Sequence, residues 1–225
     1  MISKILHFVK VTTPSLTGRV RGGSALLLLL LSLTACSTDS ESYDPYDNWQ
    51  ARNAAWYSQV ADSARQAIRQ AQAQYGTQWE QHCPWRMFKS FQKSPAYRGT
   101  LEDSICVHIL SPGTGSYSPT YNDTVSIYFR GQLMPTTDEQ GNRIETIFDQ
   151  TYYGPFDSAT AATHTNTVSV YTDGFATALQ HMVAGDDWMV YIPQQLFYGE
   201  TSQGLIPSYS AVRFRIGLVK VTPVK

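Results

Sequence analysis

Residues 172–221 read TDGFATALQHMVAGDDWMVYIPQQLFYGETSQGLIPSYSAVRFRIGLVKV. The stretch is dense in aromatic and aliphatic residues around glycine turns, and it holds no evident nucleophile, metal-ligand cluster or phosphate-binding loop. Residues 175–182 (FATALQHM) read as a short helix that Gly174 opens, with Asp173 as a candidate N-cap. The segments WMVYI and AVRFRIGLVKV alternate in the manner of strands. The stretch therefore predicts one helix followed by two strands. Because it holds no evident reactive group, any catalysis there has to depend on a shaped apolar pocket.

The chain upstream of this stretch adds further strand patterns from Ser104 onward. ICVHIL (105–110) runs into the turn SPGTG, TVSIYFRGQL (124–133) alternates, and VSVY (168–171) is a short apolar run. SPGTG lacks the third glycine and the following helix of a nucleotide-binding loop, so it reads as a turn. Several antiparallel strands with one helix predict an α+β fold, in which a twisted sheet wraps over that helix.

A longer helical pattern precedes the strands, from Asp47 or Asn48 to Tyr75. Either of the first two residues is a plausible N-cap, and Gly76 is a plausible stop. The residues expected on its apolar face are Trp49, Trp56, Val60, Ala64, Ala67, Ala71 and Tyr75. We expect this helix to pack on its own domain; the alternative is a dimerising or client-binding helix. Residues 77–103 are expected to be a linker with some ordered aromatic anchors.

The first 35 residues have the pattern of an export signal. They carry four basic residues and no acidic one, followed by the apolar run ALLLLLLSL, which is too short to span a bilayer. The run ends in LTAC (33–36), which resembles the lipobox of bacterial lipoproteins, so Cys36 is expected to be lipidated after cleavage. An ordinary secretion signal is the alternative. Residues 36–46 are polar and acidic, and they are expected to form a flexible tether, or an export signal to the cell surface.

Charge and cysteine usage exclude several function classes. Residues 36–225 carry 13 Lys and Arg against 18 Asp and Glu without a basic cluster, so nucleic acid is not an expected partner. No zinc-binding or hydrolase motif occurs, and we expect neither a metal nor another cofactor. Cys83 and Cys106 could pair in an oxidising envelope, but the sequence leaves that open.

An ordered series of blocks resembles the FKBP-type peptidyl-prolyl cis-trans isomerases. Members of that family show a Y-x-G-x-L strand, an FDSS turn, a G-W-x-x-A-L-x-x-M helix entry, I-P-x-x-L-A-Y-G and I-P-x-x-x-x-L-x-F. The corresponding blocks here are IYFRGQL, FDQ, DGFATALQHM, IPQQLFYG and GLIPSYSAVRF. The resemblance covers about residues 104–221. It implies an FKBP-like isomerase domain over residues 104–225, preceded by the helix and linker of residues 47–103.

The resemblance also implies the residues of a site. Tyr198, Asp149 and Phe175 are expected to have catalytic roles, with Phe175 as the pocket floor and Tyr198 as a hydrogen-bond donor to the substrate backbone. Thr172 stands where the family offers a backbone N–H to the ligand. The other residues expected to bind substrate are Phe129, Phe148, Val168, Tyr171, Ile206 and Phe214.

The sequence departs from the family pattern in the pocket. Phe175 replaces a tryptophan, Phe129 a tyrosine, Val168 an aromatic residue and Tyr171 a valine, and Gln203 stands where histidine is frequent. Insertions flank the FDQ block, and a second FDS begins at residue 156. We prefer Phe148 over Phe156 for the pocket wall because Phe148 ends an apolar strand pattern, whereas Phe156 follows the turn signal YYGP.

The resemblance and the leader together imply an isomerase for Xaa-Pro bonds, anchored in the cell envelope through Cys36, at the outer membrane on its periplasmic side or at the cell surface. Proline-containing polypeptides are its expected clients, and a homodimer through the N-terminal helix is possible. The alternative is a catalytically weak binding or chaperone module with the same anchor, favoured by the substitutions at residues 168 and 175 and by the insertions.

Overall fold

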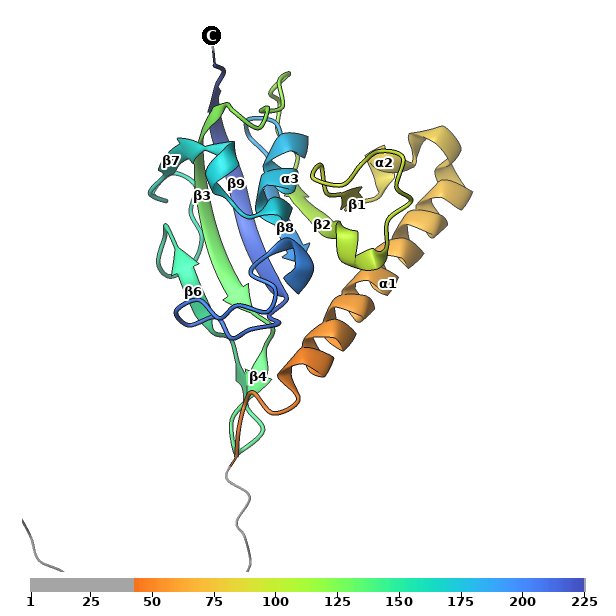
Figure 1. The fold of residues 1–225 in the computed structure, drawn as a ribbon. Helices are drawn as coiled ribbons and strands as arrows, with labels where there is room; N and C mark the ends of the chain where they lie inside the picture. The colour runs from red at the N-terminus through yellow and green to blue at the C-terminus, as the bar shows by residue number, and fades with distance from the viewer. Residues whose placement is uncertain (1–42, 225) are drawn as a thin grey trace, which may run out of the picture. The chain divides into compact units, whose positions relative to one another are not determined.

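A seven-stranded antiparallel sheet is the centre of the structure, a computed structural model that describes residues 43–224 (Figure 1). The expected signal peptide, Cys36 and most of the expected tether lie outside the described residues. The helices are α1 (Trp49–Tyr75), η1 (Gly76–Gln78), α2 (Trp79–His82), η2 (Leu101–Asp103), η3 (Val168–Val170), α3 (Asp173–His181) and η4 (Gln194–Leu196). The strands are β1 (Trp85–Lys89), β2 (Ser104–Ser111), β3 (Thr124–Leu133), β4 (Thr136–Thr137), β5 (Arg143–Ile144), β6 (Ile147–Gln150), β7 (His164–Thr167), β8 (Asp187–Ile192) and β9 (Val212–Thr222).

The strands of the main sheet follow the order β1-β2-β8-β9-β3-β6, with β7 also pairing with β3. β3 and β9 pair along the full length of β3, while β6 and β7 share its other edge. β6 pairs with the C-terminal end of β3 and β7 with its N-terminal end, so the insertion between them leaves and re-enters the same edge. β4 and β5 form a separate hairpin inside the first insertion.

Strand alternation gives the sheet two buried faces. On β2, Ile105 and Val107 belong to the main core with α3, whereas Cys106 between them belongs to a second cluster beneath α1. The buried face of α3 contributes Ala178 and Leu179 to the main core. The sheet thus wraps over one short helix, as predicted, and the α+β class with a preceding N-terminal helix is confirmed.

Helix α1 packs on its own domain, which confirms the expected packing role. It runs along the sheet beside β1 and β2 (Figure 1) and buries Tyr57, Ala61 and Ala64. The ring of Trp56 on this helix lies edge-on to the ring of Tyr191 on β8, with ring centroids 5.9 Å apart. Since this face is already buried, the possible dimer through α1 would have to use the remaining polar face, and it stays a prediction.

The buried face of α1 is shifted relative to the predicted one. Asn53 and Tyr57 are buried although they were not expected, whereas Tyr75 is exposed. Polar pairing explains the shift, because the Asn53 side chain accepts a hydrogen bond from the backbone N–H of Ala211 and the Tyr57 hydroxyl donates to the carbonyl of Ser104. Hydrophobic periodicity cannot detect a residue that is buried for its hydrogen bonds.

The ends of the helices lie close to their predicted positions. Helix α1 ends at Tyr75, and the next residue is Gly76, the predicted stop. Gly76 has a φ of +57°, in the left-handed region that glycine adopts readily. Asn48 occupies the N-cap position of α1 but makes no side-chain capping bond, and Thr172 rather than Asp173 precedes α3.

Two segments differ from the sequence expectation. The segment expected to be a linker instead contributes strand β1, which pairs with β2 from Trp85↔His108 to Lys89↔Ser104. The expected strand 168–171 is one turn of 3₁₀ helix, closed by the bond from Tyr171 N–H to the carbonyl of Val168. Cys83 and Cys106 are both buried and unbonded to each other. Within residues 43–224, none of the helices has the length and hydropathy of a membrane span.

Candidate active site

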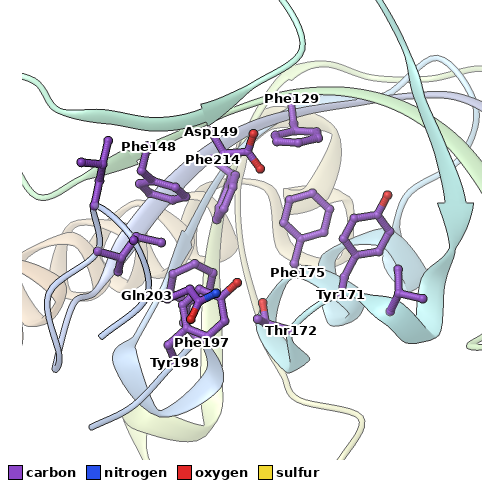
Figure 2. A pocket seen from close by; sticks show the side chains of 14 residues that line it. Phe129, Phe148, Asp149, Tyr171, Thr172, Phe175, Phe197, Tyr198, Gln203 and Phe214 are labelled. Atoms are coloured by element: carbon purple, nitrogen blue, oxygen red, sulfur yellow. The ribbon is translucent and has the colours of Figure 1, made fainter. Parts of the chain in front are cut away.

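A pocket of about 380 Å³ opens between the concave face of the sheet, the start of α3 and the loop that follows η4 (Figure 2). Four parts of the chain line it: β3 with β6, the junction of η3 and α3, the loop of residues 197–206, and β9. The lining residues are Phe129, Phe148, Asp149, Val170, Tyr171, Thr172, Phe175, Phe197, Tyr198, Gln203, Gly204, Leu205, Ile206 and Phe214.

Nine of the ten residues expected at the site line this pocket. Tyr198, Asp149 and Phe175 are present, and so are six of the seven expected to bind substrate. These six are Phe129, Phe148, Tyr171, Thr172, Ile206 and Phe214. The fold therefore brings together residues that are up to 85 positions apart in the sequence, between Phe129 and Phe214.

Phe214 is the centre of an interlocked set of rings. Its ring meets that of Phe175 edge-on at 4.9 Å and that of Phe148 edge-on at 5.4 Å between centroids. Phe129 and Phe197 meet Phe214 at 6.3 and 5.9 Å. Edge-to-face contacts of this kind are favourable, and each ring fixes the orientation of its neighbours. The apolar lining is thus already assembled without a ligand.

Gly131 of β3 makes this packing possible. A Cβ atom there would lie 2.5 Å from the Phe214 ring and 2.7 Å from the Phe148 ring. Both rings therefore lie directly over the backbone of β3, on the strand that also carries Phe129.

Phe148 and Phe156 lie in different clusters. Phe148 and Asp149 sit on β6 and line the pocket, in agreement with the preferred alignment. Phe156 instead contacts Tyr128, with ring centroids 4.5 Å apart, and the guanidinium of Arg215 lies 3.7 Å from its ring centroid. The second FDS motif thus holds the insertion against the sheet, outside the pocket.

Val168 does not line the pocket. It is fully buried in the main core, and its backbone N–H donates to the carbonyl of Asp123. The 3₁₀ turn that begins at Val168 brings Val170 to the pocket instead, where its side chain is 59% exposed. Position 168, where the family pattern has an aromatic pocket residue, is therefore a core position in this chain. The pocket residue is Val170, two positions further along the same short apolar run.

A closed loop positions Tyr198. The backbone N–H of Tyr209 donates to the carbonyl of Gly199, and Gln203 and Ile206 exchange two backbone bonds of 2.9 Å each. Gly204 and Leu205 form the tip of this small hairpin, and Leu205 is 65% exposed beside the pocket. Tyr198, half-exposed at the loop's start, thus stands at a fixed edge of the pocket (Figure 2).

Five lining residues are additional to the ten expected, and one of them, Gln203, is a departure from the family pattern already noted in the sequence. The five are Val170, Phe197, Gln203, Gly204 and Leu205. For Phe197 the sequence holds a signal, because LFYG places an aromatic residue where the family pattern has alanine. Its ring fills the space between Phe148 and Phe214. The sequence gives no such signal for Leu205, because only the observed turn of residues 203–206 places this exposed leucine beside the pocket.

The polar groups of the pocket are few. Asp149 is exposed, and Tyr198 is 39% exposed. Burial, and secondarily the nearby Asp149 carboxylate, raise the pKa of Tyr171 to about 12, so its hydroxyl stays protonated at neutral pH. Among residues 43–224 no group of three or more His, Cys, Asp or Glu side chains could hold a metal ion.

Part of the chain matches a known family. Residues 115–219 match the family described as FKBP-type peptidyl-prolyl cis-trans isomerase. This segment contains β3, α3 and most of β9, and therefore the elements that surround the pocket.

Among curated proteins, the chain is similar to the peptidyl-prolyl cis-trans isomerase Mip of Coxiella burnetii, with 29% identity over 137 residues, covering 60% of this chain and 53% of that protein. It is also 31% identical over 136 residues to the outer membrane protein MIP of Legionella longbeachae, covering 60% of this chain and 51% of that one. The chain thus spans about half the length of the curated relatives it matches. A solved peptidyl-prolyl cis-trans isomerase of Pseudomonas syringae pv. tomato aligns at a TM-score of 0.43 and 22% identity, covering 73% of this chain and 95% of that one.

Proposed function

We propose that the protein is a peptidyl-prolyl cis-trans isomerase that acts at this pocket on Xaa-Pro bonds of exported or envelope polypeptides. The observation that carries the proposal is the ring cluster around Phe214, which forms a preorganised apolar pocket inside the segment that matches the isomerase family. The relative from Coxiella burnetii carries the isomerase name, which supports the same activity.

The reaction suits a pocket without a reactive group. Rotation about the peptide bond meets a barrier of about 18–20 kcal/mol because resonance between nitrogen and carbonyl is lost. No covalent bond has to break, and the half-rotated amide is less dipolar than either planar form. An apolar pocket therefore disfavours the planar ground state more than the twisted one, which lowers the barrier.

Each group has a proposed role in that step. Phe175 is the floor on which the proline ring rests, and Phe129, Phe148, Phe197 and Phe214 wall it in. The Tyr198 hydroxyl would donate to the substrate backbone at the edge of the pocket, and the backbone N–H of Thr172 would donate to a carbonyl. Hydrogen bonds that strengthen as the amide twists add to the rate enhancement. Asp149 is the polar rim beside Phe148.

We further propose that the protein is tethered to the envelope by a lipid on Cys36, at the outer membrane or the cell surface. Support comes from the lipobox-like LTAC and the acidic stretch that follows it, and from the similarity to a protein named as an outer membrane protein. Radiolabelled palmitate should enter the full chain in an expressing diderm bacterium, and Cys36→Ser should abolish the label. Labelling that survives Cys36→Ser would contradict the anchor.

Isomerase activity is best tested with a protein of residues 37–225 and Xaa-Pro peptides, by NMR exchange or a protease-coupled assay. We expect rate enhancement that is greater when the residue before proline is bulky and apolar, because Val170 and Leu205 border the pocket. The double variant Tyr198→Phe/Phe175→Ala should lower kcat/KM about 100-fold, from the lost hydrogen bond and the lost floor. Tyr153→Phe, at an 83% exposed residue outside the pocket, is the matched control.

An unchanged kcat/KM in the folded double variant would contradict the assignment of the site. A wild-type protein that binds the peptides without accelerating their exchange would instead support the binding-module alternative.

A further inference from the structure

The first turns of α1 bond to the chain just after the pocket loop of residues 197–206. The indole N–H of Trp49 donates to the hydroxyl of Ser210, with 2.9 Å between the two heavy atoms. One turn further along the helix, the side-chain oxygen of Asn53 accepts a bond of 2.9 Å from the backbone N–H of Ala211. The side chains of Trp49, Asn53 and Ser210 are all buried. Two hydrogen bonds shielded from water thus join α1 to residues at least 158 positions away.

One branch of these contacts reaches the apolar wall of the pocket. The Ser210 hydroxyl, which accepts from Trp49, donates in turn to the carbonyl of Pro207 at 2.6 Å. A hydroxyl that accepts one bond and donates another has a fixed orientation. Pro207 directly follows Ile206, which lines the pocket and exchanges backbone bonds with Gln203. The indole N–H therefore helps to fix the chain at the point where the pocket wall ends.

A second branch reaches the edge of the pocket that carries Tyr198. Tyr209 has a φ of +61°, in the left-handed region that bulky side chains rarely adopt. Its backbone N–H donates at 2.7 Å to the carbonyl of Gly199, the residue after Tyr198. A conformation of this kind persists where the surrounding contacts impose it. The two residues that follow Tyr209 are Ser210 and Ala211, which α1 holds.

This support comes from outside the segment that matches the isomerase family. Residues 115–219 contain the pocket loop and its two bonded neighbours, whereas Trp49 and Asn53 precede the segment. Ala211 lies just before β9, so its N–H is outside the strand ladder and Asn53 supplies its acceptor. A buried N–H without an acceptor is unfavourable, so the chain here is built to be held by α1.

We propose that Trp49 and Asn53 are positioning residues for the pocket. From α1 they hold the turn of residues 207–211, and through this turn they fix the loop edge that carries Tyr198 and Ile206. Neither Trp49 nor Asn53 lines the pocket, so both act through the turn. The proposal rests on the proposed function in that it takes the pocket's substrate to be an Xaa-Pro segment. A loop that is fixed beforehand does not have to be ordered when substrate binds, and displacing its groups weakens the site.

The test compares variants that each remove one buried hydrogen bond. Trp49→Phe removes the indole N–H, and Asn53→Ala removes the acceptor of the second bond. Tyr57→Phe is the matched control, because the buried Tyr57 hydroxyl is also on α1 but donates to the carbonyl of Ser104 on β2, outside the pocket and its loop. Ser210→Ala breaks the first link from the loop side and leaves α1 intact, so it tests the link even if Trp49→Phe folds poorly.

Three quantities are measured in the protein of residues 37–225, at a temperature below every Tm. They are Tm itself, the hydrogen-exchange rates of the Ile206 and Tyr209 amides, and kcat and KM separately for an Ala-Leu-Pro-Phe peptide. The two amides are chosen because their hydrogen bonds close the loop. A smaller folded fraction would lower the apparent kcat and leave KM unchanged, whereas a displaced loop raises KM.

We expect loop closure and Tm to respond differently across the set. Every variant, the control included, should lower Tm by about 2–4 °C, because each loses one buried hydrogen bond. Trp49→Phe and Asn53→Ala should also speed amide exchange about tenfold and raise KM about three- to tenfold. Tyr57→Phe should leave the exchange rates and KM within about twofold of the wild type.

A double variant tests the route of the effect. Trp49→Phe/Ser210→Ala should have the same KM as Ser210→Ala alone, because both changes act through one hydroxyl. Additive changes in KM would contradict this route and overturn the role of Trp49.

The proposal is overturned if Trp49→Phe and Asn53→Ala leave KM and the loop exchange rates unchanged, or if Tyr57→Phe alters them equally. Unprotected Ile206 and Tyr209 amides in the wild type would overturn it as well, since the loop would then not be held. If the wild type has no isomerase activity, the proposed function fails, while the exchange rates still decide whether α1 holds the loop.

Discussion

At the scale of single residues, the pocket depends on where side chains are absent as much as on where they are present. The rings of Phe148 and Phe214 occupy the space over Gly131 that a Cβ atom would need. The glycine lies inside strand β3, near its C-terminal end, where it would otherwise weaken pairing. Its place there is explained by the close approach of the two rings.

Gly131→Ala should therefore displace both rings, lowering the free energy of unfolding by about 1–3 kcal/mol and kcat/KM by more than tenfold. Urea unfolding and the exchange assay measure the two effects. Gly141→Asn is a suitable control, because Gly141 has a φ of +81°, which asparagine tolerates, and open space around it. Equal behaviour of the two variants would show that the ring packing does not depend on Gly131.

Sequence reasoning succeeded for the aromatic lining and missed residues whose role is set by a local turn. Phe129, Phe175 and Phe214 fall on elements with clear patterns, so their common location followed from the fold. Val168 and Val170 are two valines in one short apolar run, and only the observed 3₁₀ turn decides which is buried. A periodicity argument cannot distinguish a strand from such a turn over four residues.

At the scale of elements, α3 links the pocket to a histidine at the helix's other end. His181 is stacked between the rings of Phe88 and Phe91, with centroid separations of 3.8 and 4.8 Å. Burial lowers the pKa of His181 below its usual value of 6.5, although a helix C-terminus by itself favours the charged form.

Because the folded-state pKa of His181 lies below the unfolded-state value, the unfolded chain binds the proton more strongly. The contribution of His181 to stability is therefore complete above pH 6.5 and decreases as the pH falls below it. Tm measured from pH 8 to pH 5 should fall less steeply in His181→Gln than in the wild type. Burial also lowers the pKa of His108, so His108→Gln is the parallel measurement. An identical pH slope in His181→Gln and wild type would refute the effect.

The helix α1 shows why element boundaries are easier to predict than element faces. Its length and its stop at Gly76 follow from periodicity and from glycine's access to positive φ. Its buried face follows from partners far along the chain, such as the Ala211 N–H that pairs with Asn53. No local pattern contains that information.

At the scale of the whole molecule, α1 and β1 are integral parts of the sheet structure. α1 covers Cys106 and Tyr191 on the face opposite α3, and β1 pairs with the edge of β2. Trp49 and Asn53 bond to Ser210 and Ala211, in the segment that leads from the pocket loop into β9. The matching family segment, residues 115–219, includes none of these N-terminal elements.

A protein of residues 104–225 should therefore fold poorly, although it contains all the predicted site residues. It would expose the apolar face beneath α1 and the edge of β2, which favours aggregation. A protein of residues 43–225 is the control, and circular dichroism melts with analytical ultracentrifugation compare the two. A cooperative, monomeric melt of the shorter protein at the same Tm would show that α1 is dispensable.

The same arrangement has a spectroscopic consequence. All five tryptophans, at positions 49, 56, 79, 85 and 188, lie on α1, α2, β1 and β8, and none lines the pocket, whose rings are phenylalanine and tyrosine. Intrinsic tryptophan fluorescence thus reports on the N-terminal elements and, through Trp188, on the main core of the sheet. An emission change on unfolding would report the loss of these contacts, while a ligand could fill the pocket with the emission spectrum unaltered.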